Sequence, residues 1–246
     1  MRFIGVIILL LVVGSCGVDD SADDGNEIDE GPSTAEEWDL NKWEIPRFLG
    51  LYMSGEPVRR ISKFRSGVGH DYSDDFEECR SMKHYFDVPE STEVYSPLAG
   101  KVIWLSGEWT GVKVMIRSSD YPAFLIELFH MDLEKPLAVG DEVGKGQLLG
   151  YHSSANTSSD IAIMLQTNED GPVSNDLPRS NGTRLISYFD CLEDDAFEEL
   201  QASFNGKAKR TDYILSKETR DAEIFDCDRD WSLGGEREYY WVYDLP

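Results

Sequence analysis

The four histidines of the chain carry the side chains best suited to metal binding and proton transfer. Two of them lie close to an aspartate: His70 precedes Asp74 by four residues, and His84 precedes Asp87 by three. Imidazole and carboxylate groups are zinc ligands, and a catalytic zinc ion takes three protein ligands and keeps one open position. The alternative for each histidine is a hydrogen-bonded loop residue without a chemical role.

Four short apolar runs between residues 94 and 150 are the elements that must position such side chains. Clusters of Gly, Pro, Ser and Asp separate them, a pattern typical of consecutive β-strands in a compact barrel or sandwich. The last turn, residues 139–150, contains glycines that accept positive backbone angles. The run that begins at Phe124 ends in His130, and period-two alternation predicts that His130 shares a face with Phe124 and Leu128. A core histidine without a chemical role is the alternative.

These motifs, in this order, resemble those of the lysostaphin/LytM-type metalloendopeptidases, which hydrolyse peptidoglycan cross-bridges. The family pattern has a V-x-A-x-x-x-G-x-V strand, a strand that ends in His, a V-G-x-x-V-x-x-G-x-x-I-G turn and a final His-x-His strand. The chain carries counterparts from about residue 69 to residue 167. The resemblance implies a mainly β fold, a LytM-like β barrel-sandwich (duplicated hybrid motif).

Lipoyl and biotinyl carrier domains share the glycine-rich turn, so this turn alone does not decide between the two families. A carrier lysine must stand at the exposed tip of a hairpin. Lys113 instead lies within the predicted strand 112–116, and Lys145 lacks the flanking pattern. These positions argue against a carrier domain.

The resemblance assigns zinc ligands to particular residues. In the related enzymes, zinc is held by the His and Asp of a His-x-x-x-Asp segment and by the second His of the His-x-His strand. His70 and Asp74 match the first two ligands, and His84 is a rival whose spacing to the next aspartate is one residue short. An insertion, residues 75–85, separates the favoured pair from the turn that follows.

The final predicted strand, residues 159–166, departs from the family pattern. Asp160 stands where the first His belongs, and Ala162 replaces the zinc ligand. A methyl group cannot coordinate a metal, so a family-type site loses its third ligand. The other two family histidines act on the transition state, and the resemblance assigns these catalytic positions to His130 and Asp160.

The predicted function is therefore a peptidase-like domain that lacks zinc catalysis, with no cofactor expected, and that binds peptidoglycan or another envelope protein as a regulatory module. Family members with missing ligands that activate cell-wall amidases belong to this class. The alternative is an active metalloendopeptidase of peptidoglycan whose zinc site is rebuilt from His70, Asp74 and Asp160, assisted by His130. A purely structural envelope protein is the third hypothesis.

Residues 1–16 predict a lipoprotein signal peptide. Arg2 precedes the apolar run 3–13, and Val13-Gly14-Ser15-Cys16 resembles a lipobox, in which Cys16 becomes lipidated. The alternative is an ordinary secretory signal with a chance cysteine. We therefore expect a lipid-anchored, periplasm-facing protein of the bacterial cell envelope, and Gly17 after the cysteine favours the outer membrane.

Residues 17–37 contain nine acidic residues and no basic ones, which predicts a disordered acidic tether. They contribute to a formal net charge of −24, which argues against a nucleic-acid partner and against docking by charge on anionic lipid. The lipid on Cys16 is then the predicted contact with the membrane.

The remaining residues divide into an N-terminal strap (38–68), the peptidase-like β core (69–170) and a small α-helical C-terminal extension with an aromatic tail (171–246). The spacing of apolar residues predicts an amphipathic helix at 190–204 and a second short helix within 211–222. The aromatic tail is either a late strand or a lid.

Cys79, Cys191 and Cys227 remain after lipidation of Cys16. In an oxidising compartment, three cysteines predict one disulfide and one odd thiol. A bond between Cys191 and Cys227 would staple the extension to itself, whereas a bond from Cys79 to either would tie the extension to the core. Sequence spacing leaves both possibilities open.

Overall fold

The computed structural model of the chain describes residues 45–54, 57–74, 80–168, 171–172, 182–204, 207–223 and 237–243. These residues belong to one compact unit, Glu37–Pro246. The signal peptide, the acidic tether, Cys79 and Cys227 lie outside the described residues, so the anchor, the disulfide and the domain boundaries stay predictions. Cys191 is a buried free thiol. None of the helices in the described ranges is long and apolar enough to cross a membrane.

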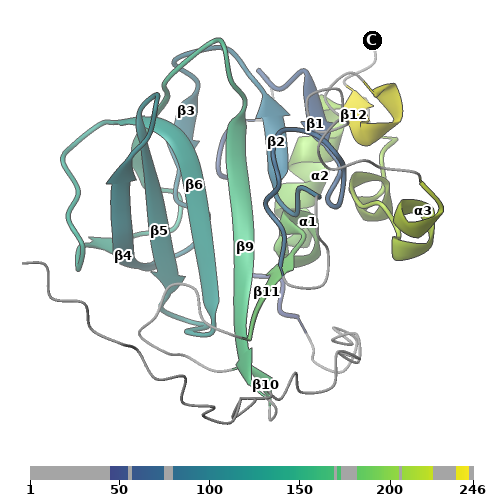
Figure 1. Ribbon diagram of the computed structural model, residues 1–246. Coiled ribbons are helices and arrows are strands. Elements are labelled where there is room, and N and C mark those ends of the chain that lie inside the picture. Colours follow the sequence, from purple (N-terminus) through teal and green to yellow (C-terminus); the bar gives the residue numbers. More distant parts are fainter. Residues whose placement is uncertain are drawn as a thin grey trace, which may run out of the picture. The chain divides into compact units, whose positions relative to one another are not determined.

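Antiparallel β-strands make up most of the described unit, as Figure 1 shows. From one edge to the other, the main sheet contains β12 (Trp241–Tyr243), β1 (Arg60–Ser62), β2 (His84–Asp87), β9 (Ser159–Asn168), β6 (Phe124–Leu133), β5 (Val112–Ser118), β4 (Gly100–Gly107) and β7 (Glu142–Val143). Branching from it are β10 (Gly171–Pro172) and β11 (Thr183–Ile186), which pair with β9, and β8 (Leu148–His152), which pairs with β6 and with β3 (Glu93–Tyr95). The predicted mainly β fold is confirmed, and each apolar run between residues 94 and 150 contains a strand.

Both faces of the central strand β6 are covered, which explains its nearly continuous apolar sequence. The first face of the sheet carries the larger apolar core, which includes Phe124, Ile126, Leu128, Ile161 and Ile163. The second face carries a smaller cluster, which includes Met115, Leu125, Phe129, Ala162 and Met164. Phe64, Tyr72 and Met82, from the segment that precedes β2, cover this second face.

Glycines in the turn 139–150 serve two different purposes. Gly140 and Gly146 have φ values of 101° and 76°, so the prediction of positive backbone angles is confirmed there. Gly150 is required for another reason: a Cβ atom at this position would lie 2.1 Å from the carbonyl oxygen of Asp132 on β6. The close pairing of β8 with β6 therefore excludes any side chain at Gly150.

The amphipathic helix predicted at 190–204 is present, but it begins later than predicted, because a separate short helix precedes it. α1 (Tyr188–Cys191) ends at Cys191, and α2 (Asp194–Ser203) begins after two extended residues. The backbone is extended there because it pairs with the N-terminal strap. The amides of Phe48 and Leu49 donate to the carbonyl of Cys191, at 3.0 Å each, and the amide of Glu193 donates to Leu49 at 2.9 Å.

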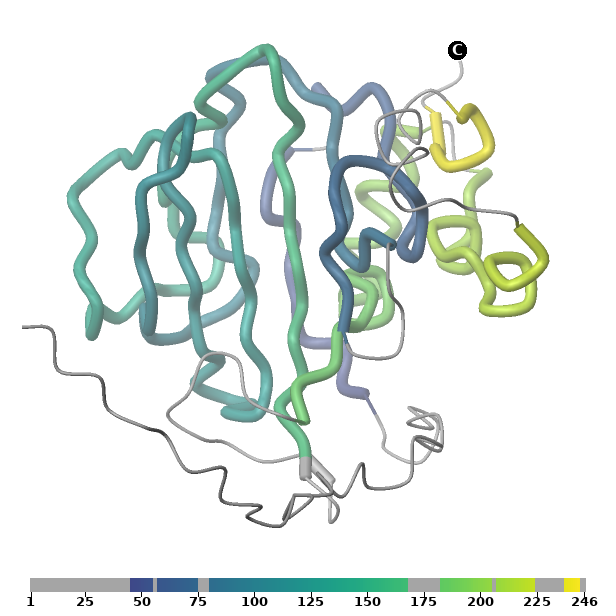
Figure 2. Tube along the Cα trace, viewed as in Figure 1, coloured from purple at the N-terminus to yellow at the C-terminus, as the bar shows by residue number. Residues whose placement is uncertain are grey.

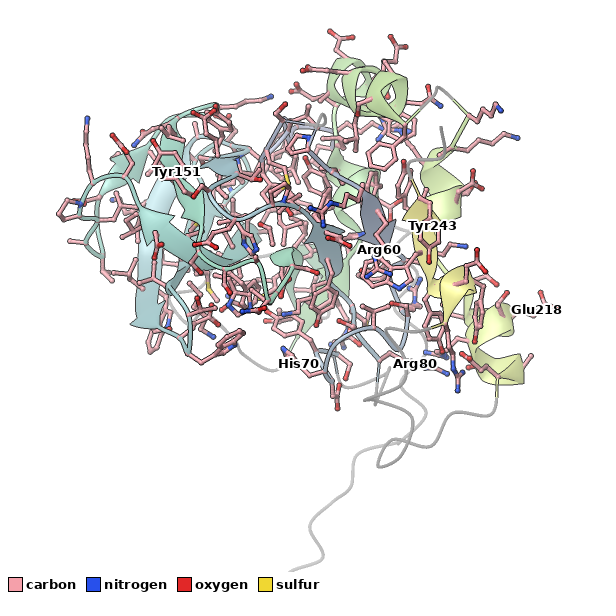
Figure 3. The ribbon with its side chains drawn as sticks, turned by 90° about the horizontal axis from the view of Figure 1, so that it is seen from above. Arg60, His70, Arg80, Tyr151, Glu218 and Tyr243 are labelled. Carbon is pink, nitrogen blue, oxygen red and sulfur yellow. The ribbon has the colours of Figure 1, made fainter. Side chains whose placement is uncertain are left out.

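Two further C-terminal predictions are confirmed. A second short helix is present as α3 (Lys217–Ala222), beside the 3₁₀ turn η2 (Arg210–Tyr213). The aromatic tail, after the 3₁₀ turn η4 (Glu238–Tyr240), forms β12 and pairs with β1. Figure 2 shows this last part of the trace returning to β1, and Figure 3 shows Arg60 near Tyr243, its partner in the register. The tail is therefore an edge strand.

The ring of His84 connects β2 to β1 and to the start of α1 through the interior. Its Nδ1 lies 2.8 Å from the carbonyl oxygen of Ser62 on β1, and its Nε2 lies 2.9 Å from Oγ of Ser187, the N-cap of α1. Burial lowers the pKa of His84 to about 4, and the bond to Ser62 opposes this shift only in part. Both ring nitrogens of His84 already lie within hydrogen-bond distance of protein oxygens. This placement argues against His84 as the rival metal ligand.

The low pKa of His84 predicts a loss of stability in mild acid. An unfolded histidine has a pKa near ~6.5, so the unfolded chain binds the proton more tightly than the folded chain does. Neutral His84 makes its full contribution to the free energy of unfolding above the unfolded pKa. As the pH falls toward 4, the protein loses up to roughly 3 kcal/mol of this free energy. Denaturant titrations at pH 7, 5.5 and 4.5 should show that His84→Gln, although less stable at pH 7, loses less stability than the wild type on acidification. Parallel losses in the two proteins would contradict this account.

Candidate functional site

His130 lies at a bulge in β6 and has a left-handed backbone, with φ of 57°. Val114 on β5 pairs with Leu128, and Val112 pairs with Met131, so two residues of β6 stand opposite one residue of β5. The extra residue breaks the alternation, and Met131 returns to the first face. The prediction that His130 shares the face of Phe124 and Leu128 is therefore wrong. His130 is directed instead toward Asp160, whose carboxylate Oδ2 lies 3.8 Å from Nε2.

Glu108, in the turn between β4 and β5, holds His130 in this position. Its carboxylate accepts the backbone N–H of His130 at 3.0 Å and makes an ion-pair contact of 3.1 Å with Nδ1. Burial lowers the pKa of His130, but Glu108 and Asp160 outweigh it, so the pKa is raised overall. Burial in turn raises the pKa of Glu108, but the bonds from His130 outweigh that effect and lower it. The pair therefore favours an imidazolium facing a carboxylate.

Asp160 forms a buried ion pair with a lysine that the sequence did not single out. Asp160 Oδ2 lies 2.8 Å from Nζ of Lys83, and the exposed fractions of the two side chains are 1% and 0%. Lys83 directly precedes β2, where Tyr85 pairs with Asp160 and His84 pairs with Ile161. Continued by one residue, this antiparallel register sets Lys83 opposite Ala162.

Aromatic rings enclose the Lys83 ammonium group on the second face. Its Nζ lies 4.0 Å from the ring centroid of Phe129, 4.8 Å from that of Tyr85 and 5.0 Å from that of Tyr72. Such cation–π contacts stabilise a charge that has lost its water. Burial lowers the pKa of Lys83, but Asp160 and Tyr85 outweigh it and raise the pKa, so the amine is an ammonium. We call Lys83, Glu108, His130 and Asp160 the charged cluster.

A second buried carboxylate, Glu127 on β6, lies on the same face. It accepts a hydrogen bond from the hydroxyl group of Tyr72, and its other oxygen lies 3.2 Å from Nζ of Lys113 on β5. The Tyr72 ring packs edge-on against Phe129, with 5.7 Å between the ring centroids. These contacts hold the segment that contains His70 against the second face of the sheet.

His70 is exposed at the rim of the charged cluster, and Figure 3 shows its place. Its Nδ1 lies 2.9 Å from the carbonyl oxygen of Asp71, which can only accept, so Nδ1 carries the proton. The lone pair on Nε2 then faces Lys83 Nζ at 3.4 Å. The preceding Gly69, with φ of 78°, has no room for a Cβ atom, which would lie 2.2 Å from the hydroxyl oxygen of Tyr85.

Asp74 does not meet His70 in a common site. Its carboxylate accepts the backbone N–H of Leu185 on β11 at 3.1 Å, whereas His70 faces Lys83. Within the described residues, no group of three or more His, Cys, Asp and Glu side chains could hold a metal ion. Zinc ligands must converge on one point about 2 Å from each donor atom. The side chains of the described residues therefore do not supply the donor set of a zinc ion, and His70 and Asp74 as zinc ligands stay a prediction.

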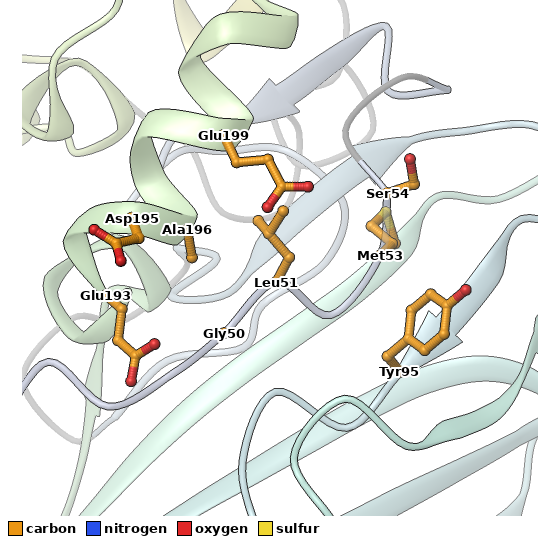
Figure 4. Close-up of a pocket in the computed structure, with 9 residues that line it drawn as sticks. All are labelled: Gly50, Leu51, Met53, Ser54, Tyr95, Glu193, Asp195, Ala196 and Glu199. Atoms are coloured by element: carbon orange, nitrogen blue, oxygen red, sulfur yellow. The ribbon is translucent and has the colours of Figure 1, made fainter.

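A separate hollow of about 440 Å³ lies between the strap and α2, as Figure 4 shows. Its lining includes Leu51, Tyr95 and the carboxylates of Glu193, Asp195 and Glu199. None of its lining residues belongs to the charged cluster. Sequence analysis missed this hollow, because the strap and the helix that form it are far apart in the chain.

No family model matches the chain, and none of the curated proteins does. Among solved structures, the chain is similar to lysostaphin, with 14% identity over 51% of this chain and 52% of that chain and a TM-score of 0.34. It is similar to a putative peptidase M23 from Pseudomonas aeruginosa, with 19% identity, 54% and 53% coverage and a TM-score of 0.30. It is also similar to the catalytic domain of the prophage-encoded M23 protein EnpA from Enterococcus faecalis, with 20% identity, 54% and 98% coverage and a TM-score of 0.35. The chain thus spans about half the length of the first two.

Proposed function

We propose that this chain is a lipid-anchored cell-envelope protein whose LytM-like β core lacks zinc catalysis and binds peptidoglycan or another envelope protein as a regulatory module. We infer the loss of catalysis from one observation: the candidate zinc donors already make hydrogen bonds to other groups of the protein. Asp74 accepts the amide of Leu185, and both His70 and Asp160 face Lys83. A catalytic zinc ion is held by three protein ligands and activates the water at its open fourth position.

Two exposed tryptophans, one of them against His130 of the charged cluster, support a binding role. Trp109 is 73% exposed, and its ring centroid lies 5.7 Å from that of His130. Trp104 on β4 is 48% exposed and pairs with Met115, which belongs to the second face. Tryptophan is enriched among the residues that dominate binding energy, because its ring offers a large apolar area and one N–H donor. This surface suits the peptide and sugar chains of peptidoglycan.

An active metalloendopeptidase built on His70, Asp74 and Asp160 is the competing function. It would require Asp74 to release the amide of Leu185 and Asp160 to release Lys83. The second change would leave a fully buried ammonium without its carboxylate, which costs about 3–5 kcal/mol when a buried pair is broken. We therefore favour the binding module.

Insoluble peptidoglycan should retain the purified chain without being cleaved. Trp109→Ala should weaken this binding roughly tenfold or more, because the substitution removes an exposed aromatic anchor. Sedimentation with peptidoglycan measures the binding, and the release of new amino termini measures hydrolysis. The matched control is Tyr239→Ala, which removes a 48% exposed ring from η4.

Hydrolysis that depends on added zinc and is abolished in His70→Ala would overturn the proposal in favour of the metalloendopeptidase. Equal binding by the wild type and Trp109→Ala would show that Trp109 does not contribute to peptidoglycan binding. No binding by either protein would leave an envelope protein as the expected partner.

The lipid anchor has its own test. Cys16→Ser should move the protein from the membrane fraction to the soluble fraction or leave its signal peptide uncleaved, because the thiol that would carry the lipid is absent. Immunoblots of fractionated cells measure both outcomes. Processing and membrane recovery equal to those of the wild type would show that residues 1–16 do not form a lipoprotein signal.

A further inference from the structure

We propose that the ammonium group of Lys83 is a built-in cation that stands in place of a metal ion on the second face of the sheet and excludes one. Two of the three donors of the rebuilt zinc site, His70 and Asp160, face this ammonium, at 3.4 Å and 2.8 Å. These side chains do not fit a family-type zinc ion because Lys83 already occupies two of the three donors. The inference rests on this geometry alone and holds whichever partner the chain binds.

The first of these donors is the lone pair on Nε2 of His70, which lies 3.4 Å from Nζ of Lys83. The proton on Nδ1 is directed to the carbonyl of Asp71, so Nε2 is the acceptor. A lysine ammonium has three N–H donors and no lone pair, so it can donate to Nε2 as readily as to the carboxylate of Asp160. Two of the atoms that would coordinate a metal, His70 Nε2 and Asp160 Oδ2, are therefore the atoms that hold Lys83.

The surroundings of Lys83 fit a permanent charge. A buried charge is tolerated where a partner and further contacts replace its water. The side chain of Lys83 is 0% exposed, Asp160 supplies the carboxylate, and the rings of Phe129, Tyr85 and Tyr72 surround Nζ. A lysine that only filled space would not need this arrangement.

The small side chain of Ala162 leaves the space that Lys83 needs in order to stand in place of a metal ion. It is 1% exposed, lies on the second face and stands where the family carries its third zinc ligand. The register of β2 with β9 sets Lys83 opposite this alanine. An imidazole at position 162 would need space next to the four-carbon stem of Lys83. A small residue at 162 and a lysine at 83 are therefore complementary.

The first experiment measures zinc binding to the full chain by equilibrium dialysis and calorimetry. The wild type and Ala162→His should bind no stoichiometric zinc, because the ammonium occupies the site and repels the ion. Lys83→Ala combined with Ala162→His should bind one zinc at least about tenfold more tightly than Ala162→His alone. In the double variant, His70, Asp160 and the introduced imidazole surround the space that the lysine side chain has left. Zinc should also raise the melting temperature of this double variant only.

The matched control combines Ala162→His with Lys113→Ala, which removes the neighbouring lysine that pairs with Glu127 on the same face. This control should behave like Ala162→His alone. Equal zinc affinity of Ala162→His with and without Lys83 would overturn the proposal, and so would stoichiometric zinc in the wild type.

A second measurement covers the case in which Lys83→Ala does not fold. Thermal unfolding of Lys83→Met, Asp160→Asn and their combination gives the coupling between the two charges. The combined variant should have a higher melting temperature than Lys83→Met, because it does not leave the Asp160 carboxylate buried without its cation. A combined loss equal to the sum of the two single losses would show that Lys83 is not the cation of this site.

Discussion

The ion pair between Lys83 and Asp160 is the interaction on which the second face of the sheet depends. Both side chains are removed from water, and Nζ lies 2.8 Å from the carboxylate. Burial of a single charge costs several kcal/mol, so the pair is stable only while the surrounding groups keep their places. Lys83 precedes β2, Asp160 lies on β9, and Phe129 lies on β6. The charge therefore couples the positions of three adjacent strands and of the segment that carries His70.

The bulge in β6 determines which side chains can join this ion pair. With strict alternation, His130 would enter the apolar core of the first face, where an imidazolium would be strongly disfavoured. The left-handed backbone at His130, which costs a non-glycine residue about 1–3 kcal/mol, turns the ring toward Asp160 instead. Glu108 compensates by accepting the amide of His130 and by contacting its ring. The bulge and Glu108 thus act together to place a second cation beside Asp160.

Local patterns in the sequence were sufficient to predict the strands but not the charged cluster. The runs between residues 94 and 150 form strands because alternation and glycine turns are local signals. The break between α1 and α2 depends on pairing with Leu49, more than 140 residues away, and no local signal marks it. Likewise, Lys83 and Asp160 are 77 positions apart. The available signal was a lysine next to the large side chains of Met82, Tyr85 and Phe86, a place where a buried charge requires a partner.

The second face of the sheet balances its buried carboxylates with lysines of the same chain. Its two buried carboxylates, Asp160 and Glu127, are matched by Lys83 and Lys113. The two ammonium groups supply the same charge as one divalent ion, so these four charges cancel although the chain carries a formal net charge of −24. Because the lysines are covalently part of the chain, this neutralisation does not vary with the concentration of metal ions. The neighbouring surface formed by Trp109 and His130 therefore keeps the same charged surroundings at any metal concentration.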